Sequence, residues 1–431
     1  MSAIEAPRTV GIVRGFASTP LLATGIFVCC LAWRSPGLLT APRFWAEEGA
    51  LYYSELQNVA PLKGLVRVFN GNYQLLTDGL VEAALQFPPR YAAHVTTYLS
   101  LAVAMACCWM IARLLLARGC STWAASAAAA LFALQPGGYE VFLSATNVQW
   151  VASVLTLLLA VSDDVPAWSP RAAVHYAVLL ACGLTGTPSC ILLPLFLAGA
   201  AWRRSTFRWA MTSVLGIATA VQAGVVLAHR AELHRALSLS PHMLLPEVLQ
   251  VFYAQVLPAH VLDVLGRTVG AYDGLGHATG LQVAALGVAG MVAVTVLASR
   301  RLGLFTAGLL QVGALLIPLV NEFGALATAD DMLSGWAGSR YFFVGASSML
   351  VLMAACIDGV TATARIMGTA LVGFALLNGI STAVLAQWPK QNVEGPSVAS
   401  QVDACGTGWC RVTVWPAGLH WTFDIKPRRG G

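Results

Sequence analysis

Two adjacent carboxylates stand in a segment of the chain that is otherwise apolar and aromatic. Glu47 and Glu48 follow the first apolar run by a few residues, and they are bracketed by Trp45, Tyr52 and Tyr53. A carboxylate held against apolar chain has a raised pKa and can act as a general base. The aromatic residues suit a membrane interface or the stacking of a sugar ring. The pair is a candidate catalytic site, and two solvated loop acids are the alternative interpretation.

Polar side chains also enter the start of a later apolar run. Asn147, Gln149 and Trp150 stand where the run 148–161 begins. Amides are costly in a lipid-facing helix unless they point inward to a cavity. They therefore predict either a site for a hydroxyl-rich ligand or hydrogen bonds between helices.

A basic residue stands at the mouth of another apolar run. Arg340 precedes the run 341–357, and Tyr341 is the first residue of that run. A guanidinium at this position can hold a phosphate through two parallel hydrogen bonds. A general anchor for lipid headgroups is the alternative.

Two further acids share one face of an expected helix. Residues 73–84 show helical spacing of apolar side chains, while Asp78 and Glu82 lie four apart on another face. We expect an amphipathic helix on the membrane surface, with both acids wetting its polar face. Asp78 is kept as a candidate substrate-binding residue.

The elements that position these residues must be membrane helices. The 431 residues are 57% hydrophobic and 10% charged, with a mean hydropathy of +0.70, against roughly 25% charged residues in soluble domains. Eleven apolar runs are candidate spans: 15–33, 93–112, 122–135, 148–161, 172–184, 189–202, 210–228, 279–298, 303–320, 341–357 and 366–386. The sequence predicts an all-α polytopic membrane protein, and it gives no support for nucleic-acid binding because the basic residues form no block.

The arginines set the expected orientation. The connections with Arg113, Arg171, Arg203, Arg300 and Arg365 all fall on one side, which the positive-inside rule assigns to the cytoplasm. The N terminus is then inside and the C terminus outside. We expect a transmembrane domain over 1–386 with an extracytoplasmic loop and juxtamembrane helices at 34–91, followed by an extracytoplasmic tail at 387–431. The apolar stretch 241–277 is expected to be interfacial or re-entrant.

The tail has its own pattern. Val412, Val414, Phe423 and Ile425 alternate with other residues on both sides of a Pro-Ala-Gly turn, which predicts a β-hairpin docked on the membrane domain. Two cysteines, Cys405 and Cys410, lie beside it with four residues between them. Outside the cytoplasm they are expected to form a disulfide.

Several motifs are missing from the sequence. It has no Walker A motif and no H-E-x-x-H motif, so ATP-driven transport and zincin chemistry are disfavoured. It has no Asp-x-Asp and no soluble domain of ~100 residues, so a cytoplasmic nucleotide-sugar enzyme is disfavoured as well. We predict no metal site and no certain cofactor, and leave a divalent cation open.

The motifs at 43–49 (Arg-Phe-Trp-Ala-Glu-Glu-Gly), 147–150 (Asn-x-Gln-Trp) and 340–342 (Arg-Tyr-Phe), in this order in a helical membrane chain, resemble the bacterial GT-C-type membrane glycosyltransferases. The resemblance implies many helices and a long first outer loop with a catalytic acid. It also implies a polyprenyl-phosphate-linked sugar donor and a cell-envelope acceptor, a glycan, lipid or protein outside the cytoplasmic membrane of a bacterium. Relatives typically carry Glu-Asp where this chain has Glu47-Glu48.

The resemblance further implies an inverting displacement. Glu48, which stands where relatives carry Asp, or Glu47 removes the proton of the acceptor hydroxyl. Arg340 neutralises the leaving lipid phosphate. The remaining residues that are expected to line the sugar site are Tyr341, Trp45, Tyr52, Asn147, Gln149 and Trp150.

Two other classes of protein stay open. A secondary transporter or flippase for a polar or lipid-linked substrate would fit the hydropathy, but such proteins carry ionisable residues near mid-membrane and related halves. This chain keeps its acids in loops and shows no obvious repeat. A noncatalytic assembly partner is the third class.

Overall fold

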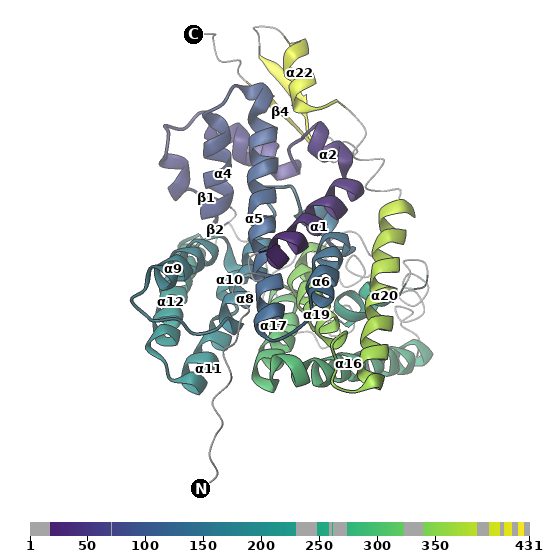
Figure 1. The fold of residues 1–431 in the computed structure, drawn as a ribbon. Coiled ribbons are helices and arrows are strands. Elements are labelled where there is room, and N and C mark those ends of the chain that lie inside the picture. The colour runs from purple at the N-terminus through teal and green to yellow at the C-terminus, as the bar shows by residue number, and fades with distance from the viewer. Residues whose placement is uncertain are drawn as a thin grey trace.

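The fold is built almost entirely from helices (Figure 1). The computed structural model describes residues 18–69, 71–229, 248–257, 261, 274–322, 339–385, 396–405, 409–415 and 421–425. Within these ranges the strands form two small two-stranded sheets. The long helices are α1 (Ser18–Arg34), α5 (Pro89–Ala117), α6 (Thr122–Leu134), α8 (Val148–Val161), α9 (Pro170–Gly183), α11 (Leu193–Arg203), α12 (Thr206–Ala228), α16 (Gly274–Leu302), α17 (Leu304–Glu322), α19 (Phe343–Cys356) and α20 (Ala362–Leu385).

Each of the eleven apolar runs overlaps one of these helices, and the chain is an all-α multi-pass membrane protein. Among the described residues, five helical segments are long and apolar enough to cross a membrane: Pro89–Ala117, Thr206–Ala228, Gln282–Leu302, Ser339–Cys356 and Ala362–Val384. Others are shorter. The 11 residues of α11 rise only about 16 Å, roughly half of the hydrocarbon thickness. Eleven crossings therefore remain a prediction.

Two helices form the centre of the bundle. All fourteen residues of α19 are buried, and so are nearly all of those of α8. Both helices pack into one large apolar core. A group of phenylalanines from four segments ties this core together near one end, with ring centroids 5.2 to 5.8 Å apart: Phe27, Phe132, Phe142 and Phe343. Such centroid distances are typical of favourable aromatic pairs.

Arginines gather at the other end of the bundle, which we call the arginine end. Arg118 donates to the carbonyls of Val161 and Leu302, so the ends of α5, α8 and α16 meet there. Arg301 donates to the carbonyl of Asp358, just after α19. Since α8 and α19 both run toward this end, Asn147 and Arg340 lie at the opposite end of the same two helices. The position of Arg118 and Arg301 at one end of the bundle agrees with the expectation that the arginine-containing connections share one side.

Serines define where helices leave the arginine end. Ser121, Ser169 and Ser205 are the N-caps of α6, α9 and α12, and each hydroxyl accepts a hydrogen bond of 3.2 Å from the amide three residues on. An N-cap serine satisfies one of the free amides of the first turn. These three turns are therefore encoded locally.

The loop after α1, which the sequence predicts to be the first outer loop, folds into short elements at one end of the bundle. They are α2 (Pro36–Thr40), η1 (Glu48–Tyr53), α3 (Ser54–Leu56), η2 (Lys63–Val66), β1 (Val68–Phe69), β2 (Asn72–Tyr73) and α4 (Leu75–Leu85). The helix expected near residues 73–84 is α4, but its polar face is not wetted. Asp78 and Glu82 are 1% and 6% exposed, and Glu82 accepts a hydrogen bond from the amide of Gly64. The expectation of a solvated acidic face was wrong because the loop folds back over this side of α4.

The tail forms the predicted hairpin. Strands β3 (Cys410–Thr413) and β4 (Thr422–Ile425) are antiparallel, with Val412 opposite Phe423. The turn at 416–418 lies outside the described residues. A helix, α22 (Val398–Ala404), precedes β3, and Cys405 and Cys410 are joined as a disulfide.

The tail docks on the first outer loop. Val412, Val414 and Phe423 share a buried apolar cluster with Phe44 and Tyr53. The backbones also pair, because the amide of Trp415 donates to the carbonyl of Phe44 and the amide of Ala46 donates to the carbonyl of Trp415, at 3.0 and 2.6 Å. The tail therefore supports the segment that carries Glu47.

Most of the stretch 241–277, expected to be interfacial or re-entrant, lies outside the described residues. Its described part includes η4 (Leu249–Tyr253) and α14 (Ala254–Val256). Leu249, Val251 and Phe252 are buried, and η4 packs against α16 and α19.

Candidate active site

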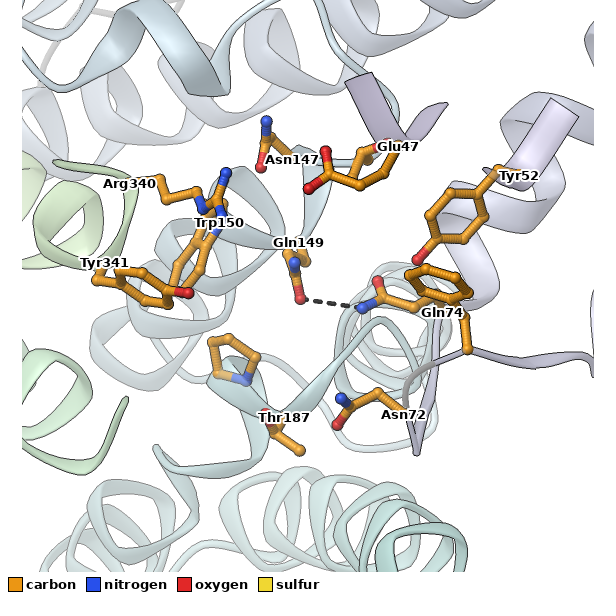
Figure 2. A pocket seen from close by; sticks show the side chains of 13 residues that line it. Glu47, Tyr52, Asn72, Gln74, Asn147, Gln149, Trp150, Thr187, Arg340 and Tyr341 are labelled. Carbon is orange, nitrogen blue, oxygen red and sulfur yellow. Dashed lines mark hydrogen bonds between the residues drawn. The ribbon is translucent and has the colours of Figure 1, made fainter. Parts of the chain in front are cut away.

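A polar pocket of about 710 Å³, open at its mouth, lies where α8 and η5 (Ser339–Phe342) begin. Its lining combines the first outer loop, the start of α8, the short helix α10 (Thr187–Cys190) and η5, and Figure 2 shows these side chains around one space. The lining residues are Glu47, Tyr52, Phe69, Asn72, Gln74, Thr146, Asn147, Gln149, Trp150, Thr187, Pro188, Arg340 and Tyr341.

Seven residues that the sequence singled out come together here. Glu47 and Tyr52 come from the first loop, Asn147, Gln149 and Trp150 from the start of α8, and Arg340 and Tyr341 from η5. Figure 2 shows Arg340, Trp150 and Tyr341 on one side, Tyr52 on the other, and Glu47 between them with its carboxylate directed into the space between these side chains.

Glu47 is the acid that contacts this space. It is half-buried, and its Oε2 atom is buried without a hydrogen-bond partner in the described chain. A buried carboxylate oxygen that lacks a partner is costly unless a ligand or water completes it. This atom is therefore free to accept a proton, or a hydrogen bond from a hydroxyl group, of a bound molecule.

Glu48 lies behind the pocket wall. It is 1% exposed, and its Oε2 accepts hydrogen bonds from Ser144 Oγ and the amide of Ala145, at 3.2 and 3.0 Å. Burial raises the pKa of this carboxyl to about 7. Glu48 does not line the pocket that Glu47 reaches, because the two side chains leave the start of the π-helical turn η1 in different directions. This arrangement does not favour the expectation that Glu48 is the base.

Arg340 faces the pocket beside a buried acid that the sequence analysis did not single out. Its Nη1 lies 3.8 Å from Oε2 of Glu140, whose side chain is 9% exposed. Glu140 belongs to α7 (Gly138–Val141), and burial raises the pKa of its carboxyl to about 7, while Arg340 opposes that shift. Glu140 orients the guanidinium, and the remaining N–H groups of Arg340 are available to an anion.

A buried arginine fixes the loop that carries Glu140. Arg34, at the end of α1, donates from Nη1 to the carbonyls of Ala133 and Gln135, at 2.6 and 3.0 Å. Its guanidinium also lies 3.7 Å from the ring centroid of Tyr139. Both contacts hold the segment between α6 and α7 against α1.

The floor of the pocket is an amide network. Gln74 Nε2 donates to Gln149 Oε1 at 3.2 Å, which is the dashed line in Figure 2. Gly186 has a positive φ of 79°, and a Cβ there would collide with the Gln149 side chain. A glycine is required at this position by both the backbone and the neighbouring amide.

Two hydrogen-bond donors in the lining have no partner within the part of the chain that is described. They are Thr146 Oγ1 and Trp150 Nε1, both buried. Buried polar atoms are nearly always paired. Together with Glu47 Oε2 they mark the pocket as a place for a polar ligand.

Two candidate residues lie outside the pocket. Trp45 is 5% exposed and packs edge-on against Trp415 with ring centroids 4.2 Å apart, so it anchors the tail. Asp78 is buried, and burial raises the pKa of its carboxyl to about 7. The charge of Arg67 opposes this rise in the pKa of Asp78. The Arg67 guanidinium also stacks on Tyr52, 5.3 Å from the ring centroid. Neither Trp45 nor Asp78 lines the pocket.

Sequence reasoning missed part of the lining, namely Phe69, Asn72, Gln74, Thr146, Thr187 and Pro188. The hairpin of β1 and β2 brings Phe69 and Asn72 in. Phe-Asn-Gly-Asn at 69–72 is a turn signal that could have revealed this hairpin. The other residues belong to helix ends without a distinctive pattern.

No group of three or more His, Cys, Asp and Glu side chains that could hold a metal ion occurs among the described residues. The chain matches no known protein-family model, and no curated protein is significantly similar to it.

Proposed function

We propose that this protein is a GT-C-like membrane glycosyltransferase of the bacterial cytoplasmic membrane. It moves a sugar from a polyprenyl-phosphate donor to a cell-envelope acceptor on the outer side. The observation that carries the proposal is one polar pocket in which Glu47 and Arg340 face the same space. An acid that can take a proton and a cation that can hold a phosphate are the two groups that this reaction needs.

The chemistry assigns one role to each group. The carboxylate of Glu47 removes the proton from an acceptor hydroxyl, and the hydroxyl oxygen attacks the anomeric carbon. The bond from that carbon to the phosphate oxygen breaks, and the electron pair leaves with the polyprenyl phosphate. Arg340 binds the phosphate charge. The leaving phosphate needs no proton, so no second acid is required, and the sugar inverts its configuration.

The rest of the lining supports a sugar between these two groups. Gln149, Asn72 and Thr187 present amides and a hydroxyl, and Trp150 and Tyr341 present aromatic rings. Hydroxyl-rich ligands pair with such amides, while aromatic faces pack on sugar rings. Glu47 is preferred over Glu48 as the base because only Glu47 lines the pocket.

The test is transfer of a radiolabelled sugar from purified polyprenyl-phosphate donors by the purified protein. We expect a glycosylated acceptor with inverted anomeric configuration, and release of polyprenyl phosphate in equal amount. Accumulation of intact donor or free sugar inside proteoliposomes, with no new glycosidic bond, would instead support the transporter or flippase.

A further inference from the structure

A second pocket opens at the arginine end, on the far side of the bundle from the candidate active site. It has a volume of about 730 Å³ and lies between α5, the end of α8 and the start of α9. Its lining includes Arg113, Arg171 and an apolar wall that contains Trp109, Met110 and Val174. Nothing in the proposed transfer reaction uses these residues.

Two arginines of this pocket lack ion-pair partners among the described residues. Arg113 and Arg171 are exposed, and neither side chain has a hydrogen bond or ion pair with any residue that the structure describes. Asp163 also lines the pocket, but its carboxylate is 3.1 Å from Arg118 and is engaged there. Nearby Arg208, in contrast, is paired with Asp164. Arg113 and Arg171 therefore face a common space, and neither has an ion-pair partner among the described residues.

The arginine end also carries the tryptophans of a membrane interface. Trp123, Trp168 and Trp202 are largely exposed, and each lies within a few residues of an arginine of this end. Exposed tryptophans gather at the level of lipid headgroups. The pocket is therefore at the depth where lipid phosphates lie.

The apolar wall indicates which anion fits. Val174 is exposed, and Trp109 and Met110 of α5 are half-buried. A free phosphate ion would gain nothing from these side chains, whereas a phospholipid places acyl chains against them and its phosphate beside the arginines. Basic pockets between membrane helices bind anionic headgroups in this way.

We propose that the pocket between α5, α8 and α9 binds an anionic phospholipid, with Arg113 and Arg171 holding its phosphate. The site is independent of the proposed transfer reaction. The lipid is a structural ligand of the arginine end, and it fills the gap between the helices.

The test is native mass spectrometry of the detergent-purified protein with phosphatidylglycerol, with phosphatidylcholine of the same acyl chains, and with inorganic phosphate alone. The double variant Arg113→Gln, Arg171→Gln removes the pocket cations. The matched control, Arg300→Gln, Arg365→Gln, removes two exposed arginines that do not line the pocket. Thermal unfolding of both variants checks that they fold.

We expect phosphatidylglycerol to be retained in preference to phosphatidylcholine. The pocket variant should weaken its retention roughly 10- to 30-fold, since each arginine near a lipid surface contributes about 1 kcal/mol, while the control keeps it. Equal loss in the control, equal retention of phosphatidylcholine, or saturation of the site by inorganic phosphate alone would each overturn the proposal.

Discussion

Neighbouring acids in this protein occupy opposite environments. Glu47 reaches the pocket, whereas Glu48 is enclosed by Ser144 and Ala145. The difference comes from the helical turn that begins at this pair, because successive side chains on a helix point in different directions. Although the two residues are adjacent in the sequence, Glu47 is the proposed base, whereas Glu48 is buried outside the pocket.

Glu48 should make stability depend on pH. Burial raises the pKa of its carboxyl from 4.5 to about 7, so the folded state binds the proton more tightly than the unfolded chain. The stabilisation is complete below about pH 4.5 and is lost as the pH rises through 7. It amounts to roughly 3 kcal/mol by linkage.

Thermal unfolding at pH 5 and pH 8 measures this effect. Asp78 and Glu140 shift in the same direction, so the comparison is between the wild type and Glu48→Gln. The variant should lose less stability at pH 8 than the wild type. An identical pH dependence in both proteins would show that Glu48 is charged in the fold.

Arg340 should bind the donor phosphate through two parallel hydrogen bonds from its planar guanidinium. Arg340→Lys keeps a cation near Glu140 but loses the paired donors, so the apparent KM for the polyprenyl-phosphate donor should rise about 10-fold or more. Arg300→Lys, at the far end of the bundle, is the control and should leave KM unchanged. If Arg340→Lys binds the donor normally, the residue only anchors headgroups.

The hairpin of β3 and β4 holds the segment that carries Glu47 in place. Gly49 lies under it, and a Cβ there would stand 2.7 Å from Val414 and 2.9 Å from Phe423. Gly49→Ala should push the hairpin away and destabilise the protein by about 1–3 kcal/mol.

Gly79→Ala in α4 is the matched control, since its nearest neighbour would be Leu65 at 3.7 Å. It should stabilise the helix by up to ~1 kcal/mol. Melting temperatures of the two variants decide between these effects. Equal behaviour of both would mean that the hairpin does not press on the acidic segment.

The helices and the hairpin could be predicted from the sequence, whereas the burial of single acidic side chains could not. Hydropathy located the helices, and period-2 alternation located the hairpin of β3 and β4, because both patterns are local. The burial of Asp78 could not be foreseen, since it depends on how Arg67 and the rest of the first loop fold back over α4. The partnership of Glu140 with Arg340 was missed for the same reason, as about 200 residues separate them in the chain.

For the whole molecule, the two ends of the bundle should face different compartments. Ala60→Cys and Ser400→Cys add exposed thiols on the side of the first loop and the tail, and Thr361→Cys adds one at the arginine end. An impermeant maleimide applied to intact cells should label the first two variants. It should label Thr361→Cys only after the membrane is opened.

The wild type provides the background in this experiment, because Cys29 is exposed on the helix bundle. Labelling of Thr361→Cys in intact cells, with protection of Ala60→Cys, would invert the orientation. Both pockets would then lie on the wrong sides for their proposed ligands.

Glu47 is the proposed base of the sugar transfer reaction. Glu47→Gln keeps the shape of the side chain but cannot accept the proton, so turnover should fall about 10²- to 10⁴-fold. Glu48→Gln, buried outside the pocket, and Asp403→Asn, an exposed acid of the tail, are the controls. Both should retain turnover within about tenfold of the wild type.

The decisive measurement is the rate of labelled-sugar transfer from a polyprenyl-phosphate donor by these four purified proteins, with thermal unfolding as the check on folding. We expect that Glu47→Gln alone loses transfer while it melts like the wild type. Full transfer by a folded Glu47→Gln variant, or a loss confined to Glu48→Gln, would contradict it.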